Sequence, residues 1–192
     1  MENFECNQPL PGAEDMGGSS FILSGERLYL CPFTESDITA DYIRWLNDPE
    51  VARFSNQRFR RHDEESCLAY LRSFAGSDNL FLAVRLAGDK RLIGTMTAYV
   101  SSHHGTADMG LLIGERGLWG RGFGLEAWNL LLNHLLQDRK LRKITAGTLR
   151  CNLGMTRIME RSGMRMEAVR SQQELVDGEP QDVLHFAKFR EN

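Results

Sequence analysis

The sequence lacks the features that mark several large classes of protein. Its 192 residues include only four cysteines, with no CxxC pair and no zinc-site spacing. We therefore expect free thiols in a reducing, cytoplasmic compartment and no structural metal. No apolar run approaches the roughly 20 residues that cross a bilayer, so we expect no membrane partner. The net charge of −3 lacks the basic surplus typical of nucleic-acid-binding domains, and we expect no nucleic-acid partner.

The first 20 residues also lack something, namely the basic and apolar parts of a secretory signal. They are rich in glycine, proline, serine and acidic residues. We expect a mobile tail over residues 1–20 and one folded domain over residues 21–192, a length that suits a single core.

The hydrophobic periodicity predicts a mixed α/β domain with a central sheet of about six to seven strands and helices on both faces. A hairpin is expected around "AGDKR" and a closing hairpin around "VDGEP", since both contain turn residues between apolar runs. The expected strands are 26–33, two within 80–100, 107–114, 143–149, 166–176 and 181–189. The expected helices begin at Thr34, Asp48 and Asp63 and span about 124–138 and 152–163.

A cluster of glycines stands directly before the most apolar predicted helix, in "LWGRGFGLEAWNLLLNHLL". Glycine loses more conformational entropy on folding than other residues, so Gly117, Gly120, Gly122 and Gly124 need a reason. The first amides of a helix lack intrahelical partners and carry positive potential. Glycines let those amides surround phosphate oxygens, and Arg121 adds a positive charge. The pattern predicts an anion site.

Two other interpretations of this turn remain open. A tight strand-to-helix turn needs glycine too, although one would be enough. The segment Gly122–Ala127 also fits the dinucleotide pattern GxGxxA. A dinucleotide fold would need parallel βαβ repeats and an acidic residue after the following strand. Here a meander precedes the turn and the next strand ends in Thr148-Leu149-Arg150.

The segment "WGRGFG" resembles the pyrophosphate loop of the GNAT N-acetyltransferases, Q/R-x-x-G-x-G/A, with Trp119 at the Q/R position. The form Trp-Gly-basic-Gly-aromatic followed by Glu-Ala is similar to the branch that contains the ribosomal-protein N-terminal acetyltransferases. "LYLCPFTESDI", "WLNDPEV", "ERSGM" and "VDGEPQDVLHFAKF" resemble further segments of that branch. The resemblance covers about residues 26–189.

The resemblance implies a sheet splayed between its fourth and fifth strands, 107–114 and 143–149, with acetyl-CoA in the gap and no metal. The cosubstrate's pantetheine arm would pair with the first of these strands, and its pyrophosphate would lie on the glycine turn. By match, the cofactor-binding residues are Leu112, Ile113, Gly114, Trp119, Gly120, Arg121, Gly122, Phe123, Gly124 and Asn152.

The resemblance also implies direct attack of an amine on the thioester, in a ternary complex. A backbone N–H near Ile113 would stabilise the developing negative charge. Asp108 and Glu115 are the candidate proton acceptors, each with surface exposure as the alternative. Asn152 is the third candidate catalytic residue, and it is equally suited to a plain helix N-cap. Relatives often place a tyrosine or serine in the next helix as the acid, whereas here Met159 and Met155 stand at those positions.

The implied partner is an amine acceptor, either a protein N-terminus or a small amine, with a polyamine or amino sugar as alternatives. The net charge is too small to choose among them. A non-enzymatic alternative is an acyl-CoA-binding regulatory module, because the usual acid is missing. The edge of the closing hairpin would allow a homodimer. His103 and His104 are adjacent on the chain and are expected to be loop residues rather than a metal pair.

Overall fold

The computed structural model describes residues 21–191. The predicted tail at 1–20, with Cys6, lies outside the described residues. The strands are β1 Leu23–Ser24, β2 Leu28–Pro32, β3 Leu80–Leu86, β4 Leu92–Ser101, β5 Thr106–Ile113, β6 Lys143–Leu149, β7 Arg165–Val176 and β8 Glu179–Phe189. The α-helices are α1 Ala40–Asn47, α2 Pro49–Ala52, α3 Glu64–Arg72, α4 Phe123–Asn133 and α5 Leu153–Arg161. Short 3-10 helices lie at Glu35–Asp37 (η1), Asn56–Phe59 (η2), Ser102–His104 (η3) and Arg116–Leu118 (η4), and a π-helical turn at His134–Asp138 (η5) extends α4.

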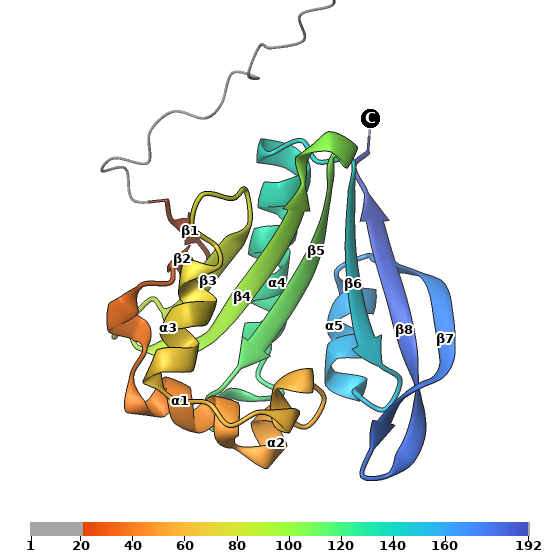
Figure 1. Cartoon of the computed structure of the whole chain (residues 1–192). Coiled ribbons are helices and arrows are strands. Elements are labelled where there is room, and N and C mark those ends of the chain that lie inside the picture. Colours follow the sequence, from red (N-terminus) through yellow and green to blue (C-terminus); the bar gives the residue numbers. More distant parts are fainter. Residues whose placement is uncertain (1–20, 192) are drawn as a thin grey trace, which may run out of the picture.

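The strands form one open sheet of eight strands in the order β1-β2-β3-β4-β5-β6-β8-β7. All neighbours are antiparallel except β5 and β6, which are parallel. Figure 1 shows these two strands diverging toward their carboxyl ends, as the family resemblance implies. The sheet has one strand more than expected because the two-residue β1 pairs with β2, and so short a strand has no alternating pattern to detect.

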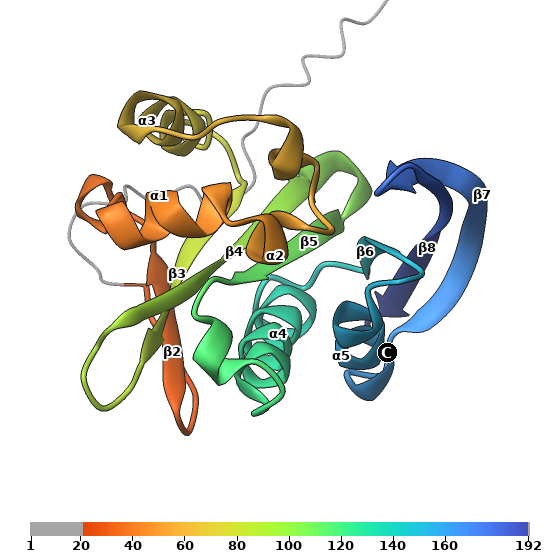
Figure 2. The same ribbon diagram turned by 90° about the horizontal axis from the view of Figure 1, so that it is seen from below.

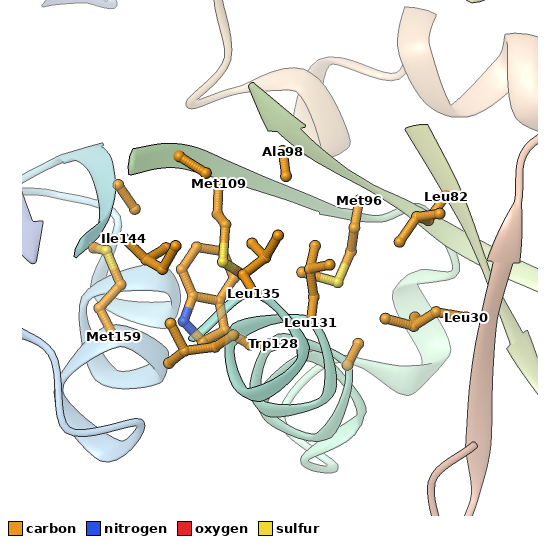
Figure 3. Packing of buried hydrophobic residues seen from close by; sticks show 14 of the residues in the cluster. Leu30, Leu82, Met96, Ala98, Met109, Trp128, Leu131, Leu135, Ile144 and Met159 are labelled. Atoms are coloured by element: carbon orange, nitrogen blue, oxygen red, sulfur yellow. The ribbon is translucent and has the colours of Figure 1, made fainter. Parts of the chain in front are cut away.

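Helices cover both faces of the sheet (Figure 2). Each layer of helices packs over its own apolar cluster. Beneath α4 and α5, the side chains of Trp128, Leu131 and Leu135 are fully buried against Met96 and Ile144 (Figure 3). On the other face, α1 and α3 cover a second, aromatic cluster. It contains Phe33, Tyr42, Trp45, Phe74 and Phe81. The central strands are therefore buried on both sides, which holds their register firmly.

The helix expected from Thr34 is interrupted. The Thr34–Asp37 capping box does form, but it closes only η1. The buried Asp37 carboxylate accepts hydrogen bonds from Thr34 and pairs with Arg85 of β3. This pairing anchors the turn to the sheet, and the chain leaves helical geometry at Ile38 before Thr39 caps α1.

The other predicted helix starts are confirmed at their caps, with Asp48 before α2 and Asp63 before α3. Cys31, Cys67 and Cys151 are free thiols. Within residues 21–191, no helix combines the length and the apolar character needed to span a bilayer.

Candidate active site

The central feature is the gap between β5 and β6. Strand β5 pairs with β4 over its whole length, from Thr106 to Ile113. It pairs with β6 only from Thr106 to Asp108, whose last partner is Thr145. Beyond that point the edge of β5 that faces β6 has no strand partner. Unpaired main-chain groups on a strand edge can accept an extended ligand as an additional strand.

The direction of the Ile113 amide follows from its neighbour. The Gly114 amide donates to the carbonyl of Ile93 in β4, at 2.9 Å. Since peptide groups alternate along a strand, the Ile113 N–H and C=O point the other way, toward the gap. The indole Nε1 of Trp119 donates to this Ile113 carbonyl at 2.7 Å. Trp119 therefore lies at the mouth of the gap, and the residue is 44% exposed.

Gly114 is required by close packing at the end of β5. A Cβ atom here would lie 2.0 Å from Cδ2 of Trp45. Trp45 belongs to α1 and is buried in the aromatic cluster. The end of β5 therefore packs tightly against α1, and this packing fixes the position of the neighbouring Ile113 amide.

The glycine turn forms an open helix N-terminus. Gly120 and Gly122 have φ angles of +72° and +87°, in the left-handed region that other residues avoid. Gly122 is the N-cap of α4 and provides no side-chain cap. Among the described residues, none accepts a hydrogen bond from the amides of Gly122, Phe123, Gly124 or Leu125. These four donors and the helix dipole favour a bound anion.

Arg27, which precedes β2, lies over this turn. Its guanidinium donates to the carbonyl of Arg121 at 2.9 Å and to Glu126 at 2.8 Å. It also stacks over the ring of Phe123, 4.5 Å from the ring centre. Burial favours the neutral form of Glu126, but the hydrogen bonds from the main chain and side chain of Arg27 outweigh it and lower the pKa of Glu126. Arg27 thus fixes the turn and adds a positive charge beside the free amides.

A polar group lies where the gap begins. Thr145 Oγ1 donates to the Asp108 carboxylate at 2.7 Å. His185 of β8 lies opposite Gly147, on the face of the sheet that carries Thr145 and Asp108. Partial burial of the Asp108 carboxylate raises its pKa, while the Thr145 hydrogen bond and the charge of His185 oppose that shift. The residue as a whole is exposed to solvent, which limits the shift.

Comparison with known proteins agrees with this geometry. Residues 27–165 match the family model of the acetyltransferase (GNAT) domain. The chain belongs to the GNAT acetyltransferases. The probable N-acetyltransferase YjcK of Bacillus subtilis is 30% identical over 94 residues, which are 48% of this chain and 51% of that protein. This chain therefore spans about half the length of this curated relative.

Solved structures of GNAT proteins share the fold. An acetyltransferase from Bacillus anthracis superposes with a TM-score of 0.77 at 22% identity, over 90% of this chain and 100% of that one. RimL, a ribosomal L7/L12 α-N-protein acetyltransferase in complex with coenzyme A, gives 0.77 at 14%, over 88% and 98%. Spermidine N-acetyltransferase from Vibrio cholerae, in complex with CoA and spermine, gives 0.76 at 18%, over 85% and 96%.

In this GNAT domain, the other two candidate catalytic residues have structural partners. Glu115 lies just past β5, accepts a hydrogen bond from Arg91 at 3.1 Å and caps η4 through the Gly117 amide. Asn152 caps α5, with Oδ1 accepting from the Met155 amide at 3.2 Å. Of the three candidates, Asp108 alone lies at the last β5–β6 pair.

The remaining predicted residues are distributed as follows. Met159 is fully buried and Met155 packs partly against the same apolar cluster. A methionine side chain has no titratable proton, so neither residue can act as an acid. His103 and His104 lie exposed on η3. Within residues 21–191, no three metal-ligating side chains converge.

Sequence reasoning missed Arg27, Thr145 and His185. Arg27 and Glu126 are 99 positions apart, and no local pattern links them. Thr145 and His185 look like ordinary strand residues, because the register that aligns them with Asp108 is a property of the folded sheet.

Proposed function

We propose that this GNAT domain transfers an acetyl group from acetyl-CoA to a primary amine by direct attack in a ternary complex. The observation that carries the proposal is the combination of an open β5 edge with an uncapped helix N-terminus at the end of the same strand. The first suits an extended amide-bearing arm and the second suits a diphosphate.

The residues of the turn fit coenzyme A. The amides of Gly122, Phe123 and Gly124 would donate to phosphate oxygens, and Arg27 and Arg121 would contribute positive charge. Ile113, whose main-chain groups face the gap, would align the pantetheine arm, while its neighbours Leu112 and Gly114 hold this part of the chain against β4. The indole of Trp119 already donates a hydrogen bond to the Ile113 carbonyl. When the pantetheine arm binds, the indole would either keep this bond and form a wall of the gap, or move away so that the arm can donate to the carbonyl.

When bound, acetyl-CoA supplies an activated thioester to the amine. The chain's own contribution is to hold charge and protons. The Ile113 N–H, directed into the gap, would donate to the oxygen on which negative charge develops, a contribution of about 3–4 kcal/mol for a single donor in other enzymes. Asp108 lies five residues from Ile113 on β5, about 16 Å at the usual rise of a strand, so it would accept the ammonium proton through a chain of waters. A raised pKa brings a carboxylate closer to the range of an effective base.

For the acceptor we propose a protein N-terminus or a small amine. Structural relatives include an enzyme named for ribosomal protein L7/L12 and one bound to spermine. An amino sugar is the alternative substrate of the same chemistry. A regulatory module that binds acyl-CoA without turnover is the non-enzymatic alternative.

The test is thiol release from acetyl-CoA in the presence of N-terminal peptides, spermidine and glucosamine, each compared with a reaction without amine. We expect amine-dependent release of CoA together with the acetylated product by mass spectrometry. Tight CoA binding without turnover on any amine would favour the regulatory module. Thermal stabilisation by NAD(P) with none by acetyl-CoA would overturn the assignment of the site.

A further inference from the structure

An arginine-lined groove lies at the end of the sheet where β5 and β6 have their carboxyl ends. One wall is the segment from the end of α1 through α2 and η2, and the other is the turn between β7 and β8. Its volume of about 580 Å³ falls within the range of roughly 300–1,000 Å³ found for ligand sites. In Figures 1 and 2, α2 and the β7–β8 turn flank the end of the sheet at which β5 and β6 diverge.

One end of the groove lies next to the proposed reaction centre. Leu46, Asn47 and Asp48 line it and directly follow Trp45, which packs on Gly114 at the end of β5. Asp48 also lies 3.7 Å from Arg116 in the loop that leaves β5. The Asp48 end of the groove thus adjoins the loop that leaves β5 at the proposed reaction centre.

The charge of the groove is opposite to that of the whole chain. Four arginines line it, against two aspartates, in a protein whose net charge is −3. The arginines are Arg53, Arg58, Arg60 and Arg61, and the aspartates are Asp48 and Asp177. Such a concentration of one sign attracts ligands of the other sign and repels polyamines.

Two of these arginines hold the walls together. Arg53 pairs with Asp177 at 3.1 Å. Arg58 donates to the Leu175 carbonyl at 2.9 Å and lies 3.9 Å from the Glu174 carboxylate. Arg60 and Arg61 are exposed, and no acidic side chain of residues 21–191 forms an ion pair with either. The nearest acid along the chain, Asp63, caps α3, and its pKa is lowered by hydrogen bonds from Ser66 and also by the charge of Arg61. Neither guanidinium group is held in an ion pair, so both are available to a ligand.

We infer that this groove binds the anionic part of the amine acceptor, and that the acceptor is a peptide whose α-amine is followed by acidic side chains. Arg60 has extended backbone angles, so the side chains of Arg60 and Arg61 diverge rather than converge on one point. Separated cations match carboxylates spread along a peptide better than a single compact phosphate. Apolar atoms of Pro49, Phe59 and Leu175 provide contacts for the rest of such a chain. The inference rests on the proposed acetyl transfer, since it names the acceptor of that reaction.

The test compares three octapeptides with serine at the N-terminus and aspartate and glutamate, asparagine and glutamine, or lysine at the next three positions. Glucosamine 6-phosphate and spermidine serve as phosphate-bearing and cationic amines. We expect kcat/KM for the acidic peptide to exceed that for the neutral one by about tenfold at low salt, with the difference shrinking as salt screens the charges. Equal rates for the acidic and neutral peptides, or a preference for the sugar phosphate or spermidine, would overturn the inference.

The matched variants are Arg60→Glu/Arg61→Glu and Arg139→Glu/Lys140→Glu. Both replace two adjacent exposed cations, but the second pair lies at the far end of the sheet, beside η5. We expect the groove variant to lose about tenfold in kcat/KM on the acidic peptide and less than twofold on the neutral one. Arg60→Gln/Arg61→Gln should fall in between. A loss of the same size in the control variant would contradict the inference.

Binding separates this inference from the proposed function. Fluorescence anisotropy of the acidic peptide, labelled at its carboxyl end, is measured on the protein saturated with CoA. If no peptide is acetylated, yet the acidic peptide binds and Arg60→Glu/Arg61→Glu abolishes its binding, the acetyl-transfer proposal fails and the groove assignment stands. If peptides are acetylated without any preference for acidic residues, the groove assignment alone fails.

Discussion

The helices α4 and α5 both begin beside the gap, but they differ in how their first main-chain amides are satisfied. At the start of α5, the Asn152 side chain satisfies the Met155 amide. At the start of α4, Gly122 has no side chain, and four amides have no acceptor among the described residues. Both starts follow a strand of the sheet and lie under the same face. An asparagine side chain is enough to cap the start of α5, yet α4 has no such cap. The uncapped start of α4 therefore indicates that an external anion binds there.

The largest expected effect concerns the point where the two strands separate. Asp108→Asn should lower kcat/KM by about 10²–10⁴-fold, the usual size of a general-base contribution, without changing CoA affinity. The pH dependence of the rate tests whether Asp108 acts as a base. Because the carboxylate must be ionised to accept a proton, the wild-type rate rises with pH through the raised pKa of Asp108, and this rise should vanish in the variant.

Stability measurements provide the control for that variant. A raised pKa in the folded protein means that Asp108 favours folding below its unfolded pKa and that this contribution is lost as pH rises through its folded pKa. Asp108→Asn should therefore keep or slightly raise Tm at neutral pH. An active Asp108→Asn enzyme with an unchanged pH profile would remove Asp108 from the mechanism.

The next largest effect is expected when a negatively charged side chain is placed at the open start of α4. Gly120→Asp should weaken CoA binding by on the order of 10–100-fold, because one added negative charge faces a diphosphate at short range. Gly76→Asp is the matched control. Both glycines have similar positive φ angles, +72° and +69°, and a Cβ at either meets nothing within 4 Å. Calorimetric titration should show the affinity loss only for Gly120→Asp, and equal losses in both would indicate backbone strain alone.

A smaller effect is expected from Arg27→Gln. Removing one cation beside the turn should lower CoA affinity by about fivefold to tenfold, while Arg27→Lys should restore part of it. The change also releases Glu126. Its lowered pKa means that the pairing stabilises the fold above the unfolded pKa and that this stability is lost as pH falls through the folded pKa. Denaturation curves at several pH values should show that this acid-sensitive contribution has gone from Arg27→Gln. Unchanged CoA affinity would exclude Arg27 from the site.

The smallest effect is expected at the capped start. Asn152→Ala should cost about 1 kcal/mol of stability, the usual value for a lost N-cap, and Asn152→Asp should retain most of it. If Asn152 serves only as a cap, the CoA affinity of Asn152→Ala remains that of the wild type by titration. A clear fall in affinity in a variant that is still folded would show that α5 also contacts the cosubstrate.

The elements of this fold are largely predictable from the sequence. The pattern alone gives β6 at Lys143–Leu149, and the Asp48 and Asp63 caps mark the starts of α2 and α3. These features depend on neighbours within a few residues. The parallel β5–β6 pair and its divergence come from the family resemblance, because strand pairing over long separations leaves no local signal.

Much of the site escapes prediction for the same reason. Arg27 reaches the glycine turn across 99 positions, and the groove joins residues 46–61 to residues 175–178. The net charge of the chain hides the arginines that gather there. The glycine turn itself was predictable, because backbone amides and left-handed glycines act through contiguous sequence.

The most direct test of the account is an ¹⁵N-¹H NMR titration of the protein with CoA, which observes the amides themselves. The account predicts large, saturable shifts at the amides of Gly120, Gly122 and Gly124, and little change at the capped Met155 amide. Saturable CoA binding that leaves the three glycine amides unmoved would contradict it.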